Sequence, residues 1–191
     1  GYTGYWTEFS EANASGGTLH NSRRNGDRVA GVFDGNTITV YRRTSRVARL
    51  STLYVDGVEY PMNNISLNIS NIIAHTVVVP DGGLHTFELV NQTGWLDFDA
   101  IEIGSSIPAT FGAYQETDPQ VVLNNTNYLW YGADSALASG GSYAVVNQYY
   151  GNMMFLFEGQ RVTAYTLKGR WWGMFSVYLD GEFVEEVDEF Y

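Results

Sequence analysis

The sequence predicts an all-β protein made of two tandem antiparallel β-sandwich repeats, of which the second is incomplete. Three observations lead to this prediction: the residue types, a repeat at a constant spacing, and a regular succession of short apolar runs and turns. The chain of 191 residues contains 14 Tyr, 10 Phe and 5 Trp, and aromatic and β-branched residues suit the half-buried surface of a sheet. No apolar pattern with a helical period is sustained, so we expect helix to be a minor component.

Landmarks in the first part of the chain recur 124 residues later. Each pair keeps the same spacing without an insertion, which indicates an internal duplication. The pairs are Trp6 and Trp130, Ser15-Gly16-Gly17 and Ser139-Gly140-Gly141, Phe33-Asp34-Gly35-Asn36 and Phe157-Glu158-Gly159-Gln160, and Tyr54-Val55-Asp56-Gly57 and Tyr178-Leu179-Asp180-Gly181. The chain therefore holds about one and a half repeats.

The first repeat is predicted to be a series of short strands joined by tight turns. Glycine supplies the positive φ that such turns need, and Asp or Asn tolerates it. In chain order we expect strands at 28–33, 37–42, 49–55, from 58 onward, 75–79, 85–90 and 95–103. The connections Asp34-Gly35-Asn36 and Asp56-Gly57 favour hairpins.

The second repeat is expected to follow the same order and to stop early. Strands are predicted at 152–157, 161–167, 173–179 and 183–187, and the segment 114–123 is similar to a first strand whose counterpart would precede Gly1. No segment matches the 75–103 half of the first repeat a second time. The predicted units are a first repeat over 1–104 without its first strand, a linker over 105–112, and a second repeat over 113–191 without its C-terminal half.

The net charge of −11 excludes several classes of partner. A phosphate backbone or an anionic membrane surface requires a basic face, so we expect neither nucleic acid nor membrane as a partner. The absence of Cys excludes disulfides, thiol catalysis and zinc–thiolate sites. No stretch approaches the roughly 20 apolar residues of a membrane span. The chain begins at Gly1 inside a pattern, without a basic or apolar leader, which indicates a mature or excised fragment.

Several segments of both repeats together form a pattern known from one family. They are Trp6, Ser15-Gly16-Gly17-Thr18, Val32-Phe33-Asp34-Gly35-Asn36-Thr37-Ile38, Tyr54-Val55-Asp56-Gly57, Gly83-Leu84-His85-Thr86-Phe87 and Phe98-Asp99-Ala100-Ile101-Glu102-Ile103, with Val177-Tyr178-Leu179-Asp180-Gly181 in the second repeat. The pattern resembles the galactose-binding-domain-like, carbohydrate-binding-module-like jelly roll, which recurs in large secreted and surface proteins of bacteria. The resemblance covers nearly the whole chain. It implies an eight- or nine-stranded sandwich that performs no chemistry and attaches to glycans or to other modules.

The arrangement of ionisable residues predicts that the chain is not an enzyme. His20, His75 and His85 lie far apart in the sequence, and His85 is expected to be a structural residue at the start of a strand. Asp97 and Asp99 are expected to face the same side of one strand, whereas a glycosidase places two carboxylates across a cleft. The motifs of a nucleophile elbow, a zinc-binding helix or a phosphate loop are not found.

The candidate contact for a sugar or a neighbouring protomer is the loop Lys168–Gly173 of the second repeat. Trp171 and Trp172 cannot both enter one core, because consecutive strand side chains face opposite ways, so one of them is expected to be exposed. An aromatic face can stack on a sugar while polar side chains bind its hydroxyls. Arg170 and Tyr165 complete this candidate set. The alternative is that an indole covers the sandwich edge; Trp6, Trp95 and Trp130 are expected to pack in the core or at sandwich ends.

The resemblance also implies a structural Ca²⁺ as a candidate cofactor, because sandwiches of this kind often hold one through carboxylate and carbonyl oxygens. Its candidate ligands are Asp99, Glu116 and Asp118. Five sequons could carry N-linked glycans: Asn13, Asn64, Asn68, Asn91 and Asn124. Of these, Asn64, Asn68 and Asn91 are expected to be accessible turn positions.

Two main hypotheses follow for the function. The first is a non-catalytic extracellular repeat module for carbohydrate binding or surface adhesion, whose partners are glycans. The second is a structural subunit of an extracellular filament or sheath, whose partners are neighbouring copies of itself. The second is favoured by the incomplete repeat, because a sandwich that lacks strands exposes edges that another chain can complete. A third reading is an accessory module of a glycosidase.

Overall fold

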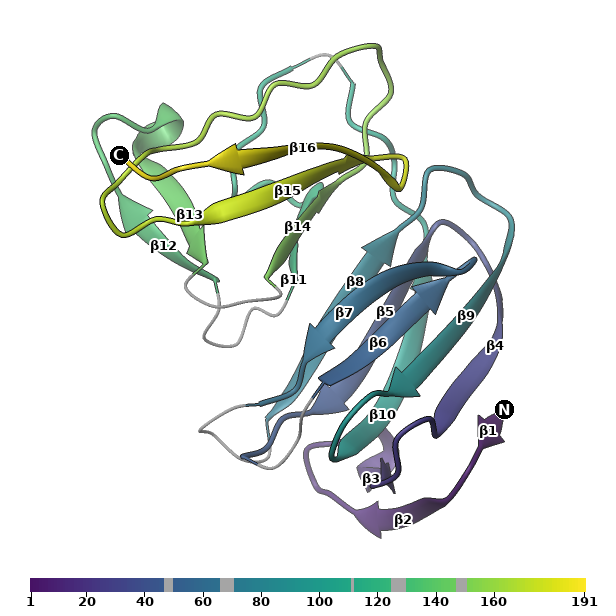
Figure 1. Cartoon of the computed structure of the whole chain (residues 1–191). Helices are drawn as coiled ribbons and strands as arrows, with labels where there is room; N and C mark the ends of the chain where they lie inside the picture. The colour runs from purple at the N-terminus through teal and green to yellow at the C-terminus, as the bar shows by residue number, and fades with distance from the viewer. Residues whose placement is uncertain (47–49, 66–70, 111, 125–129, 147–150) are drawn as a thin grey trace.

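The computed structural model describes residues 1–46, 50–65, 71–110, 112–124, 130–146 and 151–191. Within these residues the chain is all-β and its sheets are antiparallel, as the sequence predicts. The helical turns in the described part are two 3-10 turns, η1 (Ser15–Gly17) and η2 (Ser139–Gly141). None of the described helical turns has the length and apolar character that crossing a membrane requires. Figure 1 shows two lobes, the first built from the N-terminal strands and the second from the C-terminal ones.

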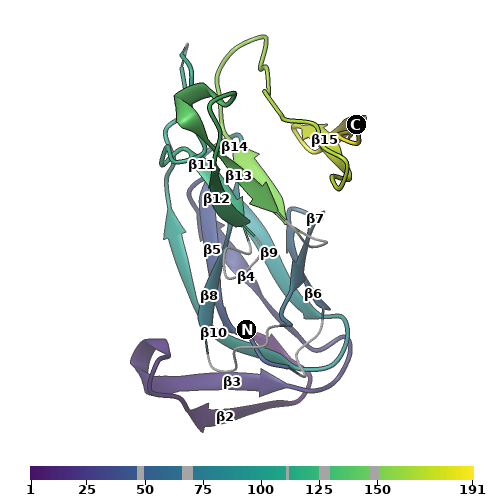
Figure 2. The same ribbon diagram turned by 90° about the vertical axis from the view of Figure 1, so that its left-hand side faces the viewer.

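The first lobe is a sandwich of two five-stranded sheets. The first sheet has the order β1-β4-β9-β6-β7, formed by Tyr2–Thr3, Arg28–Asp34, Leu84–Asn91, Leu50–Val55 and Val58–Asn63. The second has the order β2-β3-β10-β5-β8, formed by Trp6–Ser10, Thr18–Ser22, Leu96–Gly104, Thr37–Arg43 and Ile72–Val78. In Figure 2 the ribbon of β2 and β3 runs across the end of this lobe, at a steep angle to the other strands.

The two sheets enclose one apolar core because their strands alternate buried and outward-facing residues. In β9, for example, His85, Phe87 and Leu89 are buried, while Thr86 and Glu88 face outward. Full burial of a side chain such as Leu89 stabilises the fold by roughly 1.5–3 kcal/mol. The core residues are Val29, Phe33, Ile38, Val40, Leu53, Val55, Met62, Val77, Val79, Phe87, Leu89, Leu96 and Phe98.

A buried ion pair ties β10 to β5 beside this core. Asp97 Oδ2 accepts hydrogen bonds from Arg43 Nε at 2.9 Å and Arg43 Nη2 at 2.8 Å, and Asp97 Oδ1 accepts one from Asn21 Nδ2. Arg43 Nη1 also contacts Glu11 Oε2 at 2.9 Å. A β-bulge between Phe98 and Ala100 interrupts the alternation of β10. Asp99 therefore has a different partner, the backbone N–H of Ser15, instead of sharing the surroundings of Asp97.

The described residues of the second lobe form three two-stranded sheets. They pair β11 (Val121–Asn124) with β14 (Asn152–Phe155), β12 (Trp130–Asp134) with β13 (Ser142–Val146), and β15 (Met174–Leu179) with β16 (Glu182–Asp188). The lobe is joined to β8 through Asn124, whose Oδ1 accepts from Thr76 N at 2.7 Å and whose Nδ2 donates to Thr76 O at 2.6 Å. Beside β4 lies β1, in the position that β11 has beside β14.

Local geometries recur at the spacing of 124 residues. The N–H of Glu11 donates to Gly17 O and that of Ser135 to Gly141 O, each at 2.9 Å. In the two hairpin turns, Asp56 has a φ of 49° and Asp180 one of 50°. The strands β2, β3 and β6 likewise begin 124 residues before β12, β13 and β15. Equivalence of the two repeats as whole units stays a prediction.

The strand expected at 161–167 and the hairpin before it are wrong. Residues 161–167 have no regular secondary structure, and Glu158 N donates to Ala109 O instead of closing a turn. A strand is stabilised by pairing with its neighbours. The corresponding strand of the first lobe, β5, pairs with β10 and β8, whereas no described strand pairs with residues 161–167. The expected strand at 114–123 is shorter than predicted, because Gln115–Gln120 forms turns and only β11 is extended. The strands β1, β2 and β3 were not predicted at all, since their Thr, Ser and Asn residues dilute the apolar alternation.

Candidate functional site

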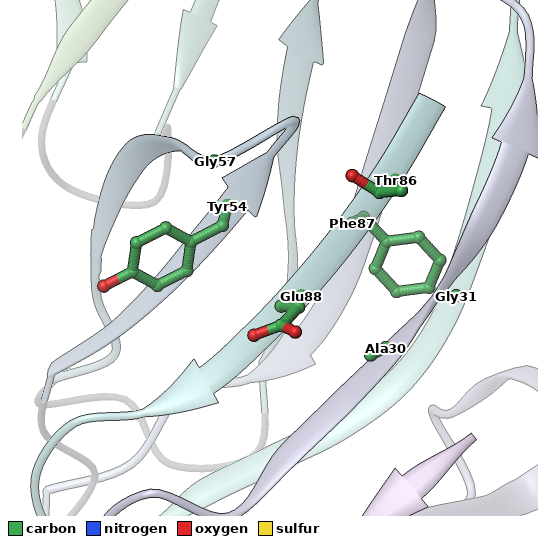
Figure 3. Close-up of a pocket in the computed structure, with 7 residues that line it drawn as sticks. All are labelled: Ala30, Gly31, Tyr54, Gly57, Thr86, Phe87 and Glu88. Atoms are coloured by element: carbon green, nitrogen blue, oxygen red, sulfur yellow. The ribbon is translucent and has the colours of Figure 1, made fainter. Parts of the chain in front are cut away.

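An open groove of about 460 Å³ lies on the outward face of the sheet that contains β4, β9 and β6. Figure 3 shows its lining residues, which come from these three strands and from the turn after β6. They are Ala30, Gly31, Tyr54, Gly57, Thr86, Phe87 and Glu88. This volume falls within the range of about 300–1,000 Å³ that is typical of small-ligand sites.

The strand register places the groove residues in one row across the sheet. Glu88 in β9 is paired with Ala30 in β4 on one side and with Tyr54 in β6 on the other. Thr86 lies two positions before Glu88 in the same strand, so both side chains face outward. The small Ala30 and the large Tyr54 lie on either side of Glu88 in this row (Figure 3).

The floor of the groove depends on the absence of a side chain at Gly31. A Cβ atom at this position would lie 2.9 Å from Cε1 of Phe87, the residue paired with it. The Phe87 ring therefore lies over the Gly31 backbone, as Figure 3 shows. The absence of a side chain at Gly31 thus leaves room for the Phe87 ring. This ring forms the floor of the groove and continues into the core.

Polar groups along the row can donate and accept hydrogen bonds. Arg28 Nη1 contacts Glu88 Oε2 at 3.2 Å, and both side chains are close to half exposed. Tyr54 Oη donates to Glu59 Oε1 at 3.2 Å and accepts from Gln92 Nε2 at 3.4 Å. Burial, and next the hydrogen bond to Glu59, raise the pKa of the Tyr54 hydroxyl, so it stays a neutral group.

The end of the groove at Gly57 is fixed by an ion pair. His85 Nδ1 lies 2.6 Å from Asp56 Oδ2, and Asp56 Oδ1 accepts from the backbone N–H of Thr86 at 2.8 Å. The hydrogen bond from Thr86, followed by that from His85, lowers the pKa of Asp56. The hydrogen bond to Asp56 raises the pKa of His85. His85 is buried and also contacts Asp81 O, which gives it the structural role that the sequence predicts.

The loop proposed from the sequence presents one tryptophan to solvent and packs the other. Trp171 is 95% exposed, whereas Trp172 is half-buried and its ring centroid lies 5.8 Å from that of Tyr143. Tyr165 is 91% exposed and Arg170 is exposed as well. In the described part of the chain no hydrogen bond, ion pair or ring contact joins Tyr165, Arg170 and Trp171. Their role as ligand contacts stays a prediction.

The three remaining tryptophans lie at strand ends. Trp6 packs against the core of the first lobe, and Trp130 Nε1 donates to Asn124 O at 2.8 Å. Trp95, just before β10, is half-buried beneath the guanidinium of Arg23.

The three candidate calcium ligands are separated. The carboxylate of Asp99 accepts from Ser15 N, that of Glu116 from Ser142 Oγ, and that of Asp118 from Gln115 N. Each of the three carboxylates thus binds a different partner. Among the residues that the structure describes, no group of three His, Cys, Asp or Glu side chains could hold a metal ion.

The accessibility expected for the sequons is wrong at two positions. Asn64 and Asn91 are 1% and 0% exposed. Their amides hold the fold together: Asn64 Oδ1 accepts from Arg42 Nε at 2.5 Å, and Asn91 Nδ2 donates to Gly94 O at 3.1 Å. Asn124 is buried against Thr76, Asn13 is exposed in the turn before η1, and Asn68 lies outside the described residues.

The groove residues were not proposed from the sequence. Ala30, Tyr54 and Glu88 are distant from one another in the sequence. Strand pairing brings them together in the fold. One signal was available, since an isolated glycine such as Gly31 inside a strand indicates close approach of another group.

No family model and no curated protein matches the sequence. Solved structures that match in part include a xanthan lyase of Paenibacillus, with 16% identity over 75% of this chain and a TM-score of 0.45. Others are an exo-β-1,3-galactanase of Phanerochaete chrysosporium in complex with β-1,3-galactotriose (17% identity, 53% of this chain, TM-score 0.43) and a family two carbohydrate esterase of Clostridium thermocellum in complex with cellohexaose (20%, 54%, 0.41). The chain covers 16%, 26% and 30% of the lengths of these three structures. These values describe a partial similarity of chain path.

Proposed function

We propose that the chain is a non-catalytic extracellular module that binds carbohydrate in the groove over Gly31. The observation that carries the proposal is the row of Tyr54, Glu88 and Ala30 on the outward face of one sheet. It combines a flat ring with polar groups in an open groove. Sugars are recognised by this combination, because an aromatic face packs on pyranose C–H groups while polar side chains bind the hydroxyls.

Each chemical group of the row has a role in the proposed complex. The Tyr54 ring is the stacking surface, and the partly exposed carboxylate of Glu88 accepts hydrogen bonds from sugar hydroxyls. Arg28, paired with Glu88 at 3.2 Å, orients that carboxylate and offers its remaining N–H donors. The Phe87 ring, largely buried beside Gly31, supplies an apolar floor.

The proposal includes the absence of catalysis in the groove. A glycosidase requires two carboxyl groups on opposite sides of the scissile bond, and Glu88 is the carboxylate among the described residues that line the groove. It also forms an ion pair with Arg28, whose Nη1 lies 3.2 Å from Glu88 Oε2.

Isothermal titration calorimetry with neutral oligosaccharides, including cellohexaose and β-1,3-galactotriose, tests this function. For the oligosaccharide that binds, Tyr54→Ala should weaken binding about tenfold, since the loss of a ring contact costs on the order of 1 kcal/mol or more. Glu88→Gln should weaken it less, because the amide still accepts one hydrogen bond.

The matched control is Tyr178→Ala. Tyr178 occupies the corresponding hairpin position of β15, 124 residues after Tyr54, is 59% exposed and packs on Phe183. Its removal should leave binding unchanged. Equal losses in the two tyrosine variants, or no binding of any oligosaccharide by the wild-type chain, would contradict the proposed site.

A second candidate function is adhesion or assembly into a filament or sheath with neighbouring copies. It is favoured by the second lobe: among the described strands, β13, β14 and β15 each pair with one strand, while their counterparts β3, β4 and β6 pair with two. Unpaired strand edges can accept strands of another chain. The exposed Trp171 is the proposed protomer contact. Light scattering across a concentration series tests this: mass should rise with concentration and fall in Trp171→Ala, and a concentration-independent monomer would exclude the assembly.

A further inference from the structure

Two exposed arginines follow β3 at the end of the first lobe. β3 lies between β2 and β10, and its last residue, Ser22, is paired with Trp6 on one side and Leu96 on the other. The residues next to these partners are Tyr5 and Trp95. The register therefore places one aromatic residue on each side of Arg23 and Arg24.

Each guanidinium lies over one of these rings. Arg23 Cζ is 4.1 Å from the centroid of the Trp95 ring, and Arg24 Cζ is 4.9 Å from that of Tyr5. A guanidinium that covers a ring with its face keeps its in-plane N–H donors available for another partner. Tyr5 is 61% exposed, so this surface is open to a ligand.

A chain of hydrogen bonds connects Arg23 to the interior. Arg23 Nε donates to Asn21 Oδ1 at 3.0 Å, and Asn21 Nδ2 donates to Asp97, which is held by Arg43. Asn21 and Asp97 are 6% and 1% exposed. Because its support is buried, the Arg23 guanidinium has a fixed orientation, and a preorganised donor loses less entropy when it binds.

The two arginines also lack the carboxylate partners that Arg28 and Arg43 have. In the part of the chain that the structure describes, neither Arg23 nor Arg24 forms an ion pair. Asp27 lies at the same end, but it is buried and accepts hydrogen bonds from Tyr5 N at 3.1 Å and Ser22 Oγ at 2.8 Å. Two guanidinium groups with unused N–H donors are thus exposed on a chain whose net charge is −11.

We propose that Tyr5, Arg23, Arg24 and Trp95 bind the carboxylate of an acidic sugar, so that the glycan taken by this chain contains uronate residues. The inference rests on the proposed function in that the ligand is a carbohydrate. A planar carboxylate matches the two N–H donors of a guanidinium, and the exposed Tyr5 ring offers a surface on which the sugar can pack. The site is formed by the ends of β2, β3 and β10, whereas the groove is formed by β4, β6 and β9.

Affinity electrophoresis of the full chain in gels that contain polygalacturonate tests the inference. The comparison is with the same polymer after methyl esterification, which removes the charge and keeps the sugar. The wild-type chain should bind the free acid at least roughly tenfold more tightly, as expected for hydrogen bonds between ionised groups. The double variant Arg23→Gln/Arg24→Gln should lose this preference, and added salt should weaken it.

The control Arg46→Gln/Arg161→Gln removes the same charge from two exposed positions outside this site, and it should keep the preference. Equal binding of both polymers by the wild-type chain, equal losses in the two double variants, or binding of dextran sulfate without binding of polygalacturonate overturns the inference. Tyr54→Ala separates the two proposals. A wild-type chain that binds neutral oligosaccharides through Tyr54 but shows no uronate preference contradicts this inference alone.

Discussion

His85 Nδ1 lies 2.6 Å from Asp56 Oδ2 and joins the start of β9 to the turn between β6 and β7. Asp56 is in the left-handed region with a φ of 49°, which is uncommon for a residue other than glycine. Its carboxylate also accepts from the N–H and the hydroxyl of Thr86. The ion pair thus holds the turn that borders the groove.

This pair predicts a pH dependence of stability. The pKa of His85 is raised above 6.5, so its contribution is complete below about 6.5 and is lost as the pH rises through the raised pKa. The pKa of Asp56 is lowered below 3.8, so its contribution is present above that pH and is lost as the pH falls through the lowered pKa. Thermal melts should therefore show the pair at full strength between about pH 4 and 6.5, and His85→Gln should flatten the decline above this range.

The control for this prediction is Asp180→Asn. Asp180 has the same turn conformation, with a φ of 50°, and no described histidine contacts it. The variant should keep the pH profile of the wild-type chain. If His85→Gln melts with the same dependence on pH as the wild type, the ion pair does not contribute as described.

Removal of Asp97 should strongly destabilise the first lobe. Its side chain is fully buried and accepts from Arg43 and Asn21, so Asp97→Ala leaves a guanidinium without its main partner. We expect a loss on the order of 3 kcal/mol in the free energy of unfolding, measured by urea denaturation. The exposed pair of Arg28 and Glu88 provides the comparison: Arg28→Gln should cost less than about 1 kcal/mol. A loss of similar size in both variants would contradict the importance of burial.

Gly31→Ala should disturb the groove floor. The added methyl group would lie 2.9 Å from Phe87 Cε1, so the ring must move within a packed core. Overpacking of this kind costs about 1–3 kcal/mol. Gly82→Ala is the control, because a Cβ there meets no atom within 4 Å. Equal stability of the two variants in urea denaturation would show that the ring moves without cost.

The sequence predicted well those features that depend on neighbouring residues. The Asp56-Gly57 and Asp180-Gly181 turns and the strands beside them are confirmed, because a tight hairpin needs the backbone freedom that these residues provide. Residues 161–167 show the limit: their apolar alternation resembles that of β5, but a strand also needs partners on its edges. The groove and the Arg23–Trp95 contact depend on register between strands distant in sequence, which local patterns do not encode.

The burial of the sequons predicts which of them a glycosylating host modifies. Asn13 is exposed, whereas Asn64, Asn91 and Asn124 use their amides inside the fold. Mass spectrometry of glycopeptides from the chain secreted by such a host should find modification at Asn13 and none at the three buried positions. Full occupancy of Asn91 would be incompatible with its place between Ser22 and Gly94.

The most direct measurement of the central claim, carbohydrate binding over Gly31, is an NMR titration of the labelled chain with the oligosaccharide that calorimetry selects. The amide signals of Gly31, Thr86 and Glu88 should shift together and saturate with one binding constant, and Tyr54→Ala should weaken that constant. Shifts confined to residues 168–173, with those three amides unchanged, would place the sugar at the Trp171 loop and contradict the account.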